Sequence, residues 1–426
     1  MTEFQRPRGT RDFGPEEMAR RRFVEARLRS TAELFGFGEV MTPTFEDTAL
    51  FVERSGEGII NEMYAFKDKG KRDIALRPEL TAPVMRFYVN ELQNRPKPVK
   101  AFYFGSVFRY ERPQSGRYRE FFQFGAELIG APSMESDAEV IALALWSLES
   151  IGLKDTAVRI GNLDILKGLL GNIGITGEDQ AACRRMIDKA DFEGLAKHLD
   201  GLGVDRLKQR NLMDIIKTKG GKEAIAEARQ LAGADIPGMD YLEGMLDKLA
   251  VYGFEKCNVD FAVARGLDYY TGMVFEIDSP CLGAEKQICG GGAYQLAELF
   301  GGETVNSTGY AFGFDRLMLA LDNSGAQIPE PGLKAYIVPM GEAARMKALE
   351  ILRMLRTANI PSDMDLMGRN ISKALAYANS ARAEKAIIIG EKELAEGSVT
   401  VRDMQSGEQT KYPMSDVLRG FLKGIF

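Results

Sequence analysis

The sequence has a single histidine, His198, and four cysteines among its 426 residues. Nucleophilic catalysis by Ser/His/Asp or Cys/His systems needs a positioned imidazole base. His198 lies in the polar stretch GLAKHLDGLG, which predicts a residue on a helix surface. The cysteines form no C-x-x-C pair, and one histidine cannot complete a Cys/His zinc set. We therefore expect reduced, structural thiols and no metal held by protein side chains.

Long apolar runs are also missing. No stretch approaches the roughly 18 residues that a membrane-spanning helix needs, and the start, MTEFQRPRGTRDFG, has no apolar signal segment. A cytoplasmic protein without membrane contact is the resulting expectation. Because the chain is long and 45% hydrophobic, it can form two or three domains with full-sized cores.

Backbone phosphate-binding loops are absent too. There is no G-x-x-x-x-G-K-[ST] motif, since KTKGGKEA lacks the first glycine, and no G-x-G-x-x-G. A nucleotide triphosphate bound without such a loop needs side-chain cations, and the planar fork of arginine matches phosphate oxygens.

FRYERPQSGRYREFFQ supplies such cations in a chain of net charge −6. Arg109 and Arg117 lie near Phe121, an aromatic ring on which a base can stack. A hairpin with solvated arginines is the alternative reading. The four arginines of this stretch are Arg109, Arg112, Arg117 and Arg119.

Residues 101–129 read as two strands flanking a polar loop. With the period of two that a strand imposes, Arg119, Phe121, Gln123, Gly125 and Glu127 share one face of the second strand. Arg109 and Glu111 share a face of the first. Polar groups in an apolar sheet are costly unless they are paired, so this row predicts ligand contacts or a mutual network.

We expect a core from residue 1 to 325, a linker at 326–333 and a compact α/β domain at 334–426. Within the core, residues 138–151 read as a buried helix and about 164–250 as an insertion of short helices. From Lys334 onward there are 14 Lys/Arg against 11 Asp/Glu, net +3. This excess is typical of a nucleic-acid contact but also of ordinary charge scatter.

Further segments carry polar groups beside structure-breaking residues. LRPELT offers Glu79 and Thr81, and RGLDYYTG places Arg265 behind an apolar run. The glycines of CGGGAY (290–292) suit close approach of backbone to a ligand. Arg316 in AFGFDRL falls in the first turn of a helix, where the helix dipole disfavours a cation and an anionic partner is expected.

Together these segments resemble the class II aminoacyl-tRNA synthetases. FRYERPQSGRYREFFQ is similar to their motif 2, AFGFDRL to motif 3, and Pro43 in EVMTPTFE to the motif 1 proline. RGLDYYTG, PRGTRDF and LRPELT are similar to segments of the histidyl-tRNA synthetases in particular. The resemblance extends from Arg6 into the C-terminal domain, and the HIGH and KMSKS motifs of class I enzymes are missing.

The resemblance implies an α+β fold, with an antiparallel sheet core, flanking helices, a helical insertion and a C-terminal anticodon-binding domain. It also implies a homodimer that uses ATP with Mg²⁺ to join L-histidine to tRNA(His) through histidyl-adenylate. Implied catalytic residues are Arg109 and Arg265, and implied ATP contacts are Arg109, Glu111, Arg117, Phe121 and Arg316. Histidine contacts would be Glu79, Thr81, Gln123, Glu127, Arg265, Tyr269, Tyr270 and Tyr294; Arg112 and Gln114 of the motif 2 loop would meet the tRNA acceptor end.

Two alternatives remain open from the sequence. A non-catalytic paralogue that senses histidine for ATP phosphoribosyltransferase shares this core, although such paralogues generally lack the C-terminal domain and lose RGLDYYTG. A class II enzyme for another amino acid would keep motifs 2 and 3 without Glu127 and RGLDYYTG. The chain also departs from the family's usual GGGRYDGL, because Ala293 and Gln295 stand where an arginine and an aspartate are expected.

Overall fold

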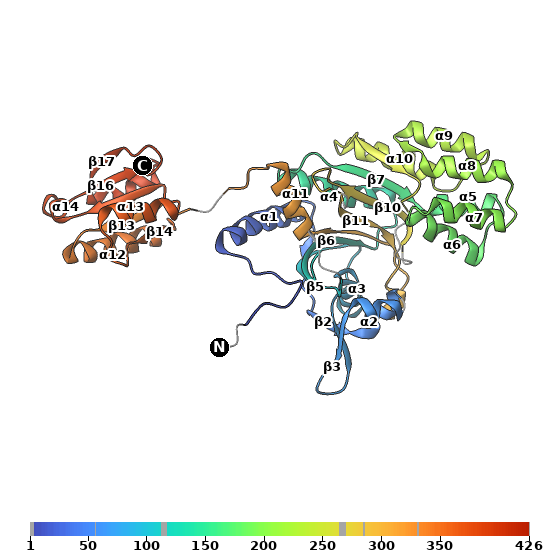
Figure 1. Ribbon diagram of the computed structural model, residues 1–426, viewed down its shortest axis with the longest axis horizontal. Coiled ribbons are helices and arrows are strands. Elements are labelled where there is room, and N and C mark those ends of the chain that lie inside the picture. Colours follow the sequence, from blue (N-terminus) through green and yellow to red (C-terminus); the bar gives the residue numbers. More distant parts are fainter. Residues whose placement is uncertain are drawn as a thin grey trace. The chain divides into compact units, whose positions relative to one another are not determined.

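The computed structural model describes residues 4–55, 57–111, 117–263, 270–283, 286–329 and 332–425. The chain divides into two compact units (Figure 1), which we describe separately. The core unit comprises Met1–Phe13 and Arg21–Ile328, and the C-terminal unit comprises Gly14–Arg20 and Pro329–Phe426. None of the helices in the described ranges is long and apolar enough to cross a membrane.

A nine-stranded, mostly antiparallel sheet organises the core unit. Six strands run antiparallel in the order β5-β6-β12-β11-β10-β7, β1 and β9 join the two sides in parallel, and β8 pairs with β9. This confirms the antiparallel core that the resemblance implied. The strands are β1 (Gly38–Glu39), β5 (Val99–Phe108), β6 (Glu120–Ile129), β7 (Ala157–Asn162), β8 (Lys219–Gly220), β9 (Cys257–Asp260), β10 (Tyr270–Asp278), β11 (Gln287–Tyr294) and β12 (Ser307–Gly313).

Strands β5 and β6 form the predicted hairpin, and β6 alternates as expected. Phe124, Ala126 and Leu128 are buried in the main hydrophobic core. The prediction for β5 was too long: the strand ends at Phe108, so Arg109 and Glu111 follow it instead of sharing its face. The chain turns there, because the Glu111 N–H donates to the Arg109 carbonyl at 2.9 Å.

Helices cover both faces of this sheet. The apolar residues of α4 and α11 pack with those of β6 and β12 on one face, and α10 (Met239–Val251) packs on α4. On the other face lies α3, and a small antiparallel sheet, β2-β4-β3, packs beside α3. The helices here are α1 (Pro15–Leu34), α2 (Thr48–Ser55), α3 (Thr81–Phe87), α4 (Met134–Ser150) and α11 (Phe314–Ser324), and the small strands are β2 (Phe45–Asp47), β3 (Tyr64–Lys67) and β4 (Asp73–Leu76).

Between β7 and β9 the chain forms a series of short helices (Figure 1). His198 lies on one of them, and its side chain is partly buried rather than fully on the surface. Its Nε2 is 3.2 Å from an Asp179 carboxylate oxygen on the neighbouring helix. The helices are α5 (Leu163–Asn172), α6 (Gly177–Asp188), α7 (Phe192–Gly201), α8 (Arg206–Lys217), α9 (Lys222–Ala232) and α10 (Met239–Val251).

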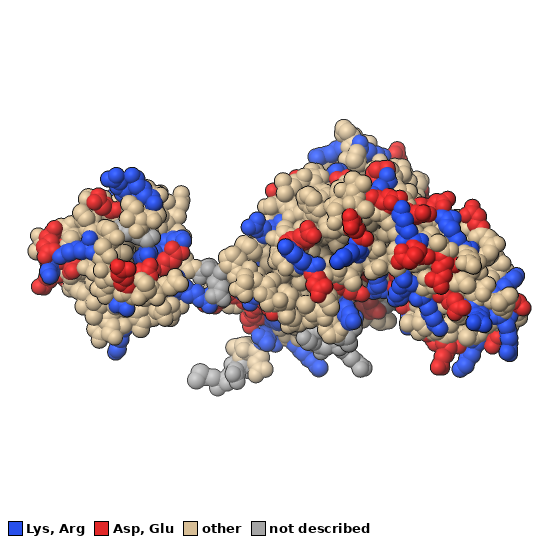
Figure 2. Space-filling model, turned by 90° about the horizontal axis from the view of Figure 1, so that it is seen from above, with Lys and Arg blue, Asp and Glu red and all other residues tan. Residues whose placement is uncertain are grey.

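The C-terminal unit is an α/β domain around a five-stranded sheet, β14-β13-β15-β16-β17. The first three strands in this order are parallel and the last two pair antiparallel. On the face shown in Figure 2, basic and acidic side chains are interspersed over this unit. Its elements are β13 (Ala335–Pro339), α12 (Glu342–Thr357), β14 (Ser362–Met364), α13 (Ile371–Ser380), β15 (Lys385–Ile389), α14 (Glu391–Glu396), β16 (Ser398–Asp403), β17 (Gln409–Pro413) and α15 (Val417–Leu422).

A buried carboxylate, Asp315, links the N-terminal segment, β6 and α11. Its Oδ1 accepts from Arg21 at 2.8 Å and from Arg11, and its Oδ2 accepts from the Phe122 N–H at 2.7 Å. The guanidinium of Arg21 also lies over the ring of Phe122 at 5.1 Å. Since the side chains of Asp315 and Arg21 are only 2% and 5% exposed, each needs the other's charge.

Asp315→Asn should lower the free energy of unfolding of the core unit by about 3–5 kcal/mol, because two guanidinium groups lose their counter-ion. Urea denaturation followed by circular dichroism measures this. Asp12→Asn is the matched control: its pair with Arg6 spans 3.7 Å and is 59% and 86% exposed, so the loss should stay below about 1 kcal/mol. Equal losses in the two variants would contradict the assignment.

Candidate active site

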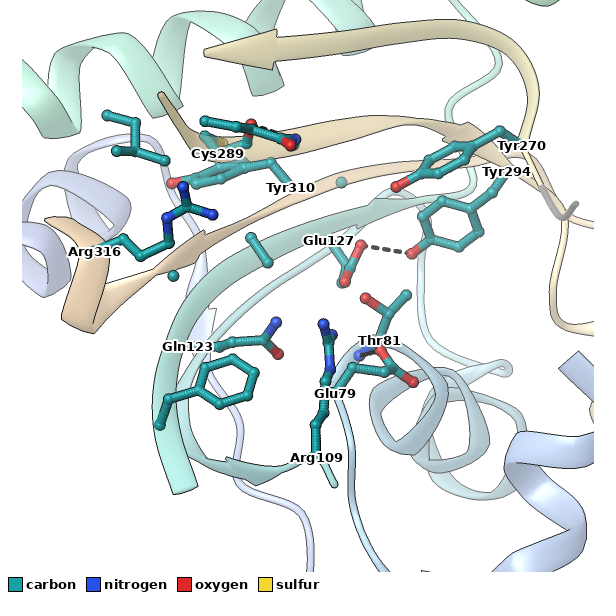
Figure 3. Close-up of a pocket in the computed structure, with 17 residues that line it drawn as sticks. Glu79, Thr81, Arg109, Gln123, Glu127, Tyr270, Cys289, Tyr294, Tyr310 and Arg316 are labelled. Atoms are coloured by element: carbon teal, nitrogen blue, oxygen red, sulfur yellow. Dashed lines mark hydrogen bonds between the residues drawn. The ribbon is translucent and has the colours of Figure 1, made fainter. Parts of the chain in front are cut away.

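A cavity of about 200 Å³ lies on the α3 side of the sheet (Figure 3). We call it the inner cavity. Nine of the residues that the sequence proposed as ligand contacts line it, from seven different elements or loops: Glu79, Thr81, Arg109, Phe121, Gln123, Glu127, Tyr270, Tyr294 and Arg316. Segments that are distant in the sequence thus converge on one space.

Glu127 stands at the centre of this cavity and is 1% exposed. Tyr103 donates its hydroxyl to Glu127 Oε1 at 2.9 Å, and Tyr294 donates to Oε2 at 2.6 Å; Figure 3 draws the second bond. Burial raises the pKa of Glu127 to about 7, although the tyrosine hydroxyls oppose the rise. The carboxylate therefore changes its charge near neutral pH.

Room for this carboxylate depends on the facing strand. Gly309 on β12 is paired directly with Glu127. A Cβ at position 309 would lie 1.7 Å from Glu127 Oε2, far inside contact distance, so only glycine permits the observed side-chain position. Ala311 and Gly313 continue this row of small residues along the cavity.

A second carboxylate, Glu79, is fixed by the start of α3. Its Oε2 accepts from the Thr81 N–H at 2.6 Å and its Oε1 from the Ala82 N–H at 3.0 Å. The first-turn N–H groups of a helix lack internal partners and favour negative charge. The helix thereby holds Glu79 at the cavity wall, and the Thr81 hydroxyl lies 3.5 Å from that of Tyr103.

An adjoining outer cavity of about 230 Å³ shares Arg109, Phe121 and Arg316 with the inner one. Arg117 and Glu111 line it as well, with 3.8 Å between their charged atoms. Its other acid, Asp315, is already neutralised by two arginines. Three arginines against Glu111 leave the space positively charged, which suits phosphate groups.

Backbone carbonyl groups hold Arg109, which lines both cavities, and its neighbour Arg77 in place. Arg109 Nε donates to the Pro78 carbonyl at 2.9 Å, and its guanidinium lies 5.3 Å from the centre of the Phe121 ring. The neighbouring Arg77 is 5% exposed and donates to the carbonyls of Thr42 at 2.7 Å and Pro43 at 3.1 Å. Burial lowers the pKa of Arg77. The proline expected from motif 1 thus contacts the LRPELT segment.

Sequence reasoning missed several lining residues. Gln287 lines both cavities from the start of β11, and Tyr118 lines the outer one. Of the glycines in CGGGAY, only Gly290 lines the inner cavity; Gly291 instead allows close packing of Phe275, whose Cε1 would lie 2.5 Å from an added Cβ. For β12, the sequence offered one signal of a cavity wall: small residues alternate along STGYAFG, at Gly309, Ala311 and Gly313. The proposed residues Arg112, Gln114, Arg265 and Tyr269 lie outside the described residues.

Comparisons with known proteins agree with this architecture. The family model described as histidyl-tRNA synthetase matches residues 9–317, and that of an anticodon binding domain matches residues 334–423. A histidine–tRNA ligase from Methanosarcina acetivorans is 46% identical over 413 residues, which span 97% of each chain. A second, from Methanoregula boonei, is 48% identical over 411 residues, 95% of each chain.

Solved structures share the fold. The structure of a histidyl-tRNA synthetase from a Nostoc species superimposes over the full length of both chains with a TM-score of 0.85 at 24% identity. Full-length relatives, two matching family models and the shared sheet lead to one conclusion. This chain belongs to the histidyl-tRNA synthetase family of class II aminoacyl-tRNA synthetases.

Proposed function

We propose that this chain joins L-histidine to tRNA(His) in two ATP-dependent steps, with histidine activated at the junction of the inner and outer cavities. The observation that carries the proposal is Glu127, a buried carboxylate between two tyrosine hydroxyls, in a space that opens onto three arginines. One part of the site suits a polar ring with N–H groups, and the adjoining part suits phosphates.

In the inner cavity, the imidazole would lie between Glu127 and Tyr270, and Tyr294 would keep the carboxylate in place. Glu127 would accept from a ring N–H. The ammonium group of histidine would meet Glu79, Thr81 and Gln123, together with Tyr269. An apolar amino acid of similar shape would leave these buried groups unpaired and would therefore bind poorly.

In the outer cavity, Glu111 and Phe121 would receive the adenine, and Arg117 and Arg316 the outer phosphates. Arg109 and Arg265 would hold the α-phosphate. A carboxylate oxygen of histidine attacks the α-phosphorus, the bond to the bridging oxygen breaks, and pyrophosphate leaves with its electron pair. Guanidinium groups fixed beside that phosphate stabilise the charge that grows there. The attacking carboxylate is already ionised, so this step needs no protein base.

Mg²⁺ would enter bound to the phosphates of ATP. Within the described ranges no group of three acidic, histidine or cysteine side chains could hold an ion on its own. Acyl transfer to the tRNA 3′ end would follow, with Arg112 and Gln114 near the acceptor end and the C-terminal unit on the anticodon arm. Substrates of this kind also favour a cytoplasmic location.

We also propose a homodimer built through the region around Pro43. Met41 is 88% exposed and Phe45 57% exposed on either side of this proline. Large apolar side chains exposed this close together in the sequence support an interface at this segment. Light scattering of the purified chain should give twice the mass of one chain.

A histidine-sensing regulatory subunit is the second candidate. One solved structure with a TM-score of 0.78 and 25% identity carries both descriptions, ATP phosphoribosyltransferase regulatory subunit and histidyl-tRNA synthetase. Histidine-dependent exchange of labelled pyrophosphate into ATP separates the two functions. Exchange with histidine alone among the twenty amino acids supports the ligase, whereas tight histidine binding without exchange supports the regulator.

Glu127→Gln should raise KM for histidine strongly and KM for ATP little. The wild-type KM for histidine should rise as pH falls from 8 to 6, because a group with a pKa of about 7 takes up a proton that competes with the imidazole N–H. This pH dependence of the KM for histidine should vanish in Glu127→Gln. Pyrophosphate exchange measured at several pH values gives the KM for histidine and the KM for ATP. Glu120→Gln on the same strand, outside both cavities, is the control; a wild-type pH profile in Glu127→Gln would rule out the assignment.

Tyr103→Phe should raise KM for histidine about tenfold, since it removes a hydrogen bond to a charged group worth roughly 1.5–3 kcal/mol. The apparent pKa in the KM profile should move upward, because the ionised form of Glu127 loses a donor. Tyr241→Phe removes a hydroxyl from another buried carboxylate, Asp137, and should change neither quantity. An unshifted profile in Tyr103→Phe would show that Tyr103 only fills space.

Ending the chain after Ile328 tests the division of labour between the units. Every residue proposed for activation precedes this point, so exchange with histidine should persist while aminoacylation collapses through the KM for tRNA. The salt dependence of tRNA binding should also weaken as phosphate contacts are lost. Circular dichroism checks folding. A folded core that charges tRNA as well as the full chain would overturn the proposal.

A further inference from the structure

A third cavity, which we call the rear cavity, lies where the first turns of α4 and α10 approach the ends of β10, β11 and β12. It has a volume of about 360 Å³ and is larger than the inner or outer cavity. Its walls include Met134, Asp137, Asn162, Tyr241, Ala293 and Tyr294. Among the described lining residues, Tyr294 is the one that the rear cavity shares with the inner cavity, so the carboxylates of the two spaces are different.

Asp137 is a buried carboxylate without a cationic partner among the described residues. It is 8% exposed and accepts from the Tyr241 hydroxyl, and the Thr308 hydroxyl lies beside it. Burial raises the pKa of Asp137, which the two hydroxyls only partly oppose. No lysine or arginine is among the described residues that line the rear cavity. A nearby cation would strongly stabilise the ionised form of such a buried carboxylate.

Asn162 provides a second polar group with unused capacity. It is 7% exposed, and its Oδ1 accepts from the Asp164 N–H at 2.9 Å, capping α5. In the described part of the chain, none of the hydrogen bonds uses its amide nitrogen. Asn162 lines the rear cavity, so its amide N–H groups can donate to an acceptor atom of a ligand there.

The position of Ala293 explains why the cavity is open next to Asp137. Ala293 on β11 pairs directly with Thr308 on β12, so the two side chains lie on the same face of the sheet. Since the Thr308 hydroxyl lies beside Asp137, the methyl group of Ala293 faces the region of that carboxylate. An arginine at 293, the residue expected from the sequence resemblance, would extend its guanidinium into this space.

We propose that the rear cavity binds a small organic cation with a guanidinium or primary ammonium head group, with Asp137 as its counter-ion. The head group takes the place of an arginine side chain at position 293. The Asn162 amide donates to an acceptor elsewhere on the ligand. This site is separate from histidine activation, and its occupation does not depend on the proposed ligase activity.

Calorimetric titration of the full chain with methylguanidinium chloride, at constant ionic strength, tests the proposal. Saturating histidine is present throughout, so that the inner cavity is occupied. We expect one saturable site per chain. Asp137→Asn, which keeps the shape and removes the charge, should weaken binding about tenfold or more, as expected for loss of a charge-assisted bond.

Ala293→Arg should abolish methylguanidinium binding, because its own guanidinium fills the cavity, and should raise the midpoint of thermal unfolding. This variant keeps the test informative even if Asp137→Asn is too unstable to titrate. Two controls locate the site: Asp164→Asn changes a rim carboxylate that is 47% exposed, and Glu127→Gln changes the inner cavity. Both should bind methylguanidinium within about threefold of wild type.

Three results would overturn the proposal. They are absence of saturable binding to the wild-type chain, unchanged binding in Ala293→Arg, and loss of binding in Glu127→Gln while Asp137→Asn retains it. The last result would place the cation in the inner cavity. None of them bears on pyrophosphate exchange, so the ligase proposal is judged independently.

Discussion

The site depends on one constraint: a carboxylate stands inside an antiparallel sheet, opposite a residue that has no side chain. Glu127 and Gly309 are register partners, and any Cβ at 309 would overlap the carboxylate. Removing that side chain creates the space, and the hydroxyls of Tyr103 and Tyr294 make the buried charge tolerable. The four strands that supply these residues, β5, β6, β11 and β12, must keep their register, so fold and site are specified together.

Charge is distributed differently in the two parts of the active site. In the inner cavity, tyrosine hydroxyls hold Glu127 and backbone N–H groups of α3 hold Glu79. The outer cavity has the opposite character, because the acid that anchors its wall, Asp315, is already paired with Arg11 and Arg21. In the proposed function, an amino acid with a polar ring and a polyphosphate would meet at the boundary, where Arg109 lines both spaces.

The rear cavity shows what a single small residue changes on the other side of the same strands. Asp137 is buried to a similar degree as Glu79, but it is held by the Tyr241 hydroxyl and lines an open cavity. Position 293 faces this space through its pairing with Thr308. The small side chain at this position leaves Asp137 and the Asn162 amide beside an open cavity.

Much of this was determined by the sequence itself. Period-two alternation placed Phe121, Gln123 and Glu127 on one face of β6, and the segments LRPELT, RGLDYYTG and AFGFDRL indicated the family and thereby the sheet. These signals are local, since strand alternation and short motifs depend on neighbours along the chain. Tyr103 and the pairing of Asp315 with Arg21 carried no such signal, and the contact of Gly309 with Glu127 did not either. Their roles arise from register and packing between residues far apart in sequence, and the raised pKa of Glu127 follows from burial. The same holds for Asp137: its lack of a cation is a property of the space around it, which only the tertiary structure decides.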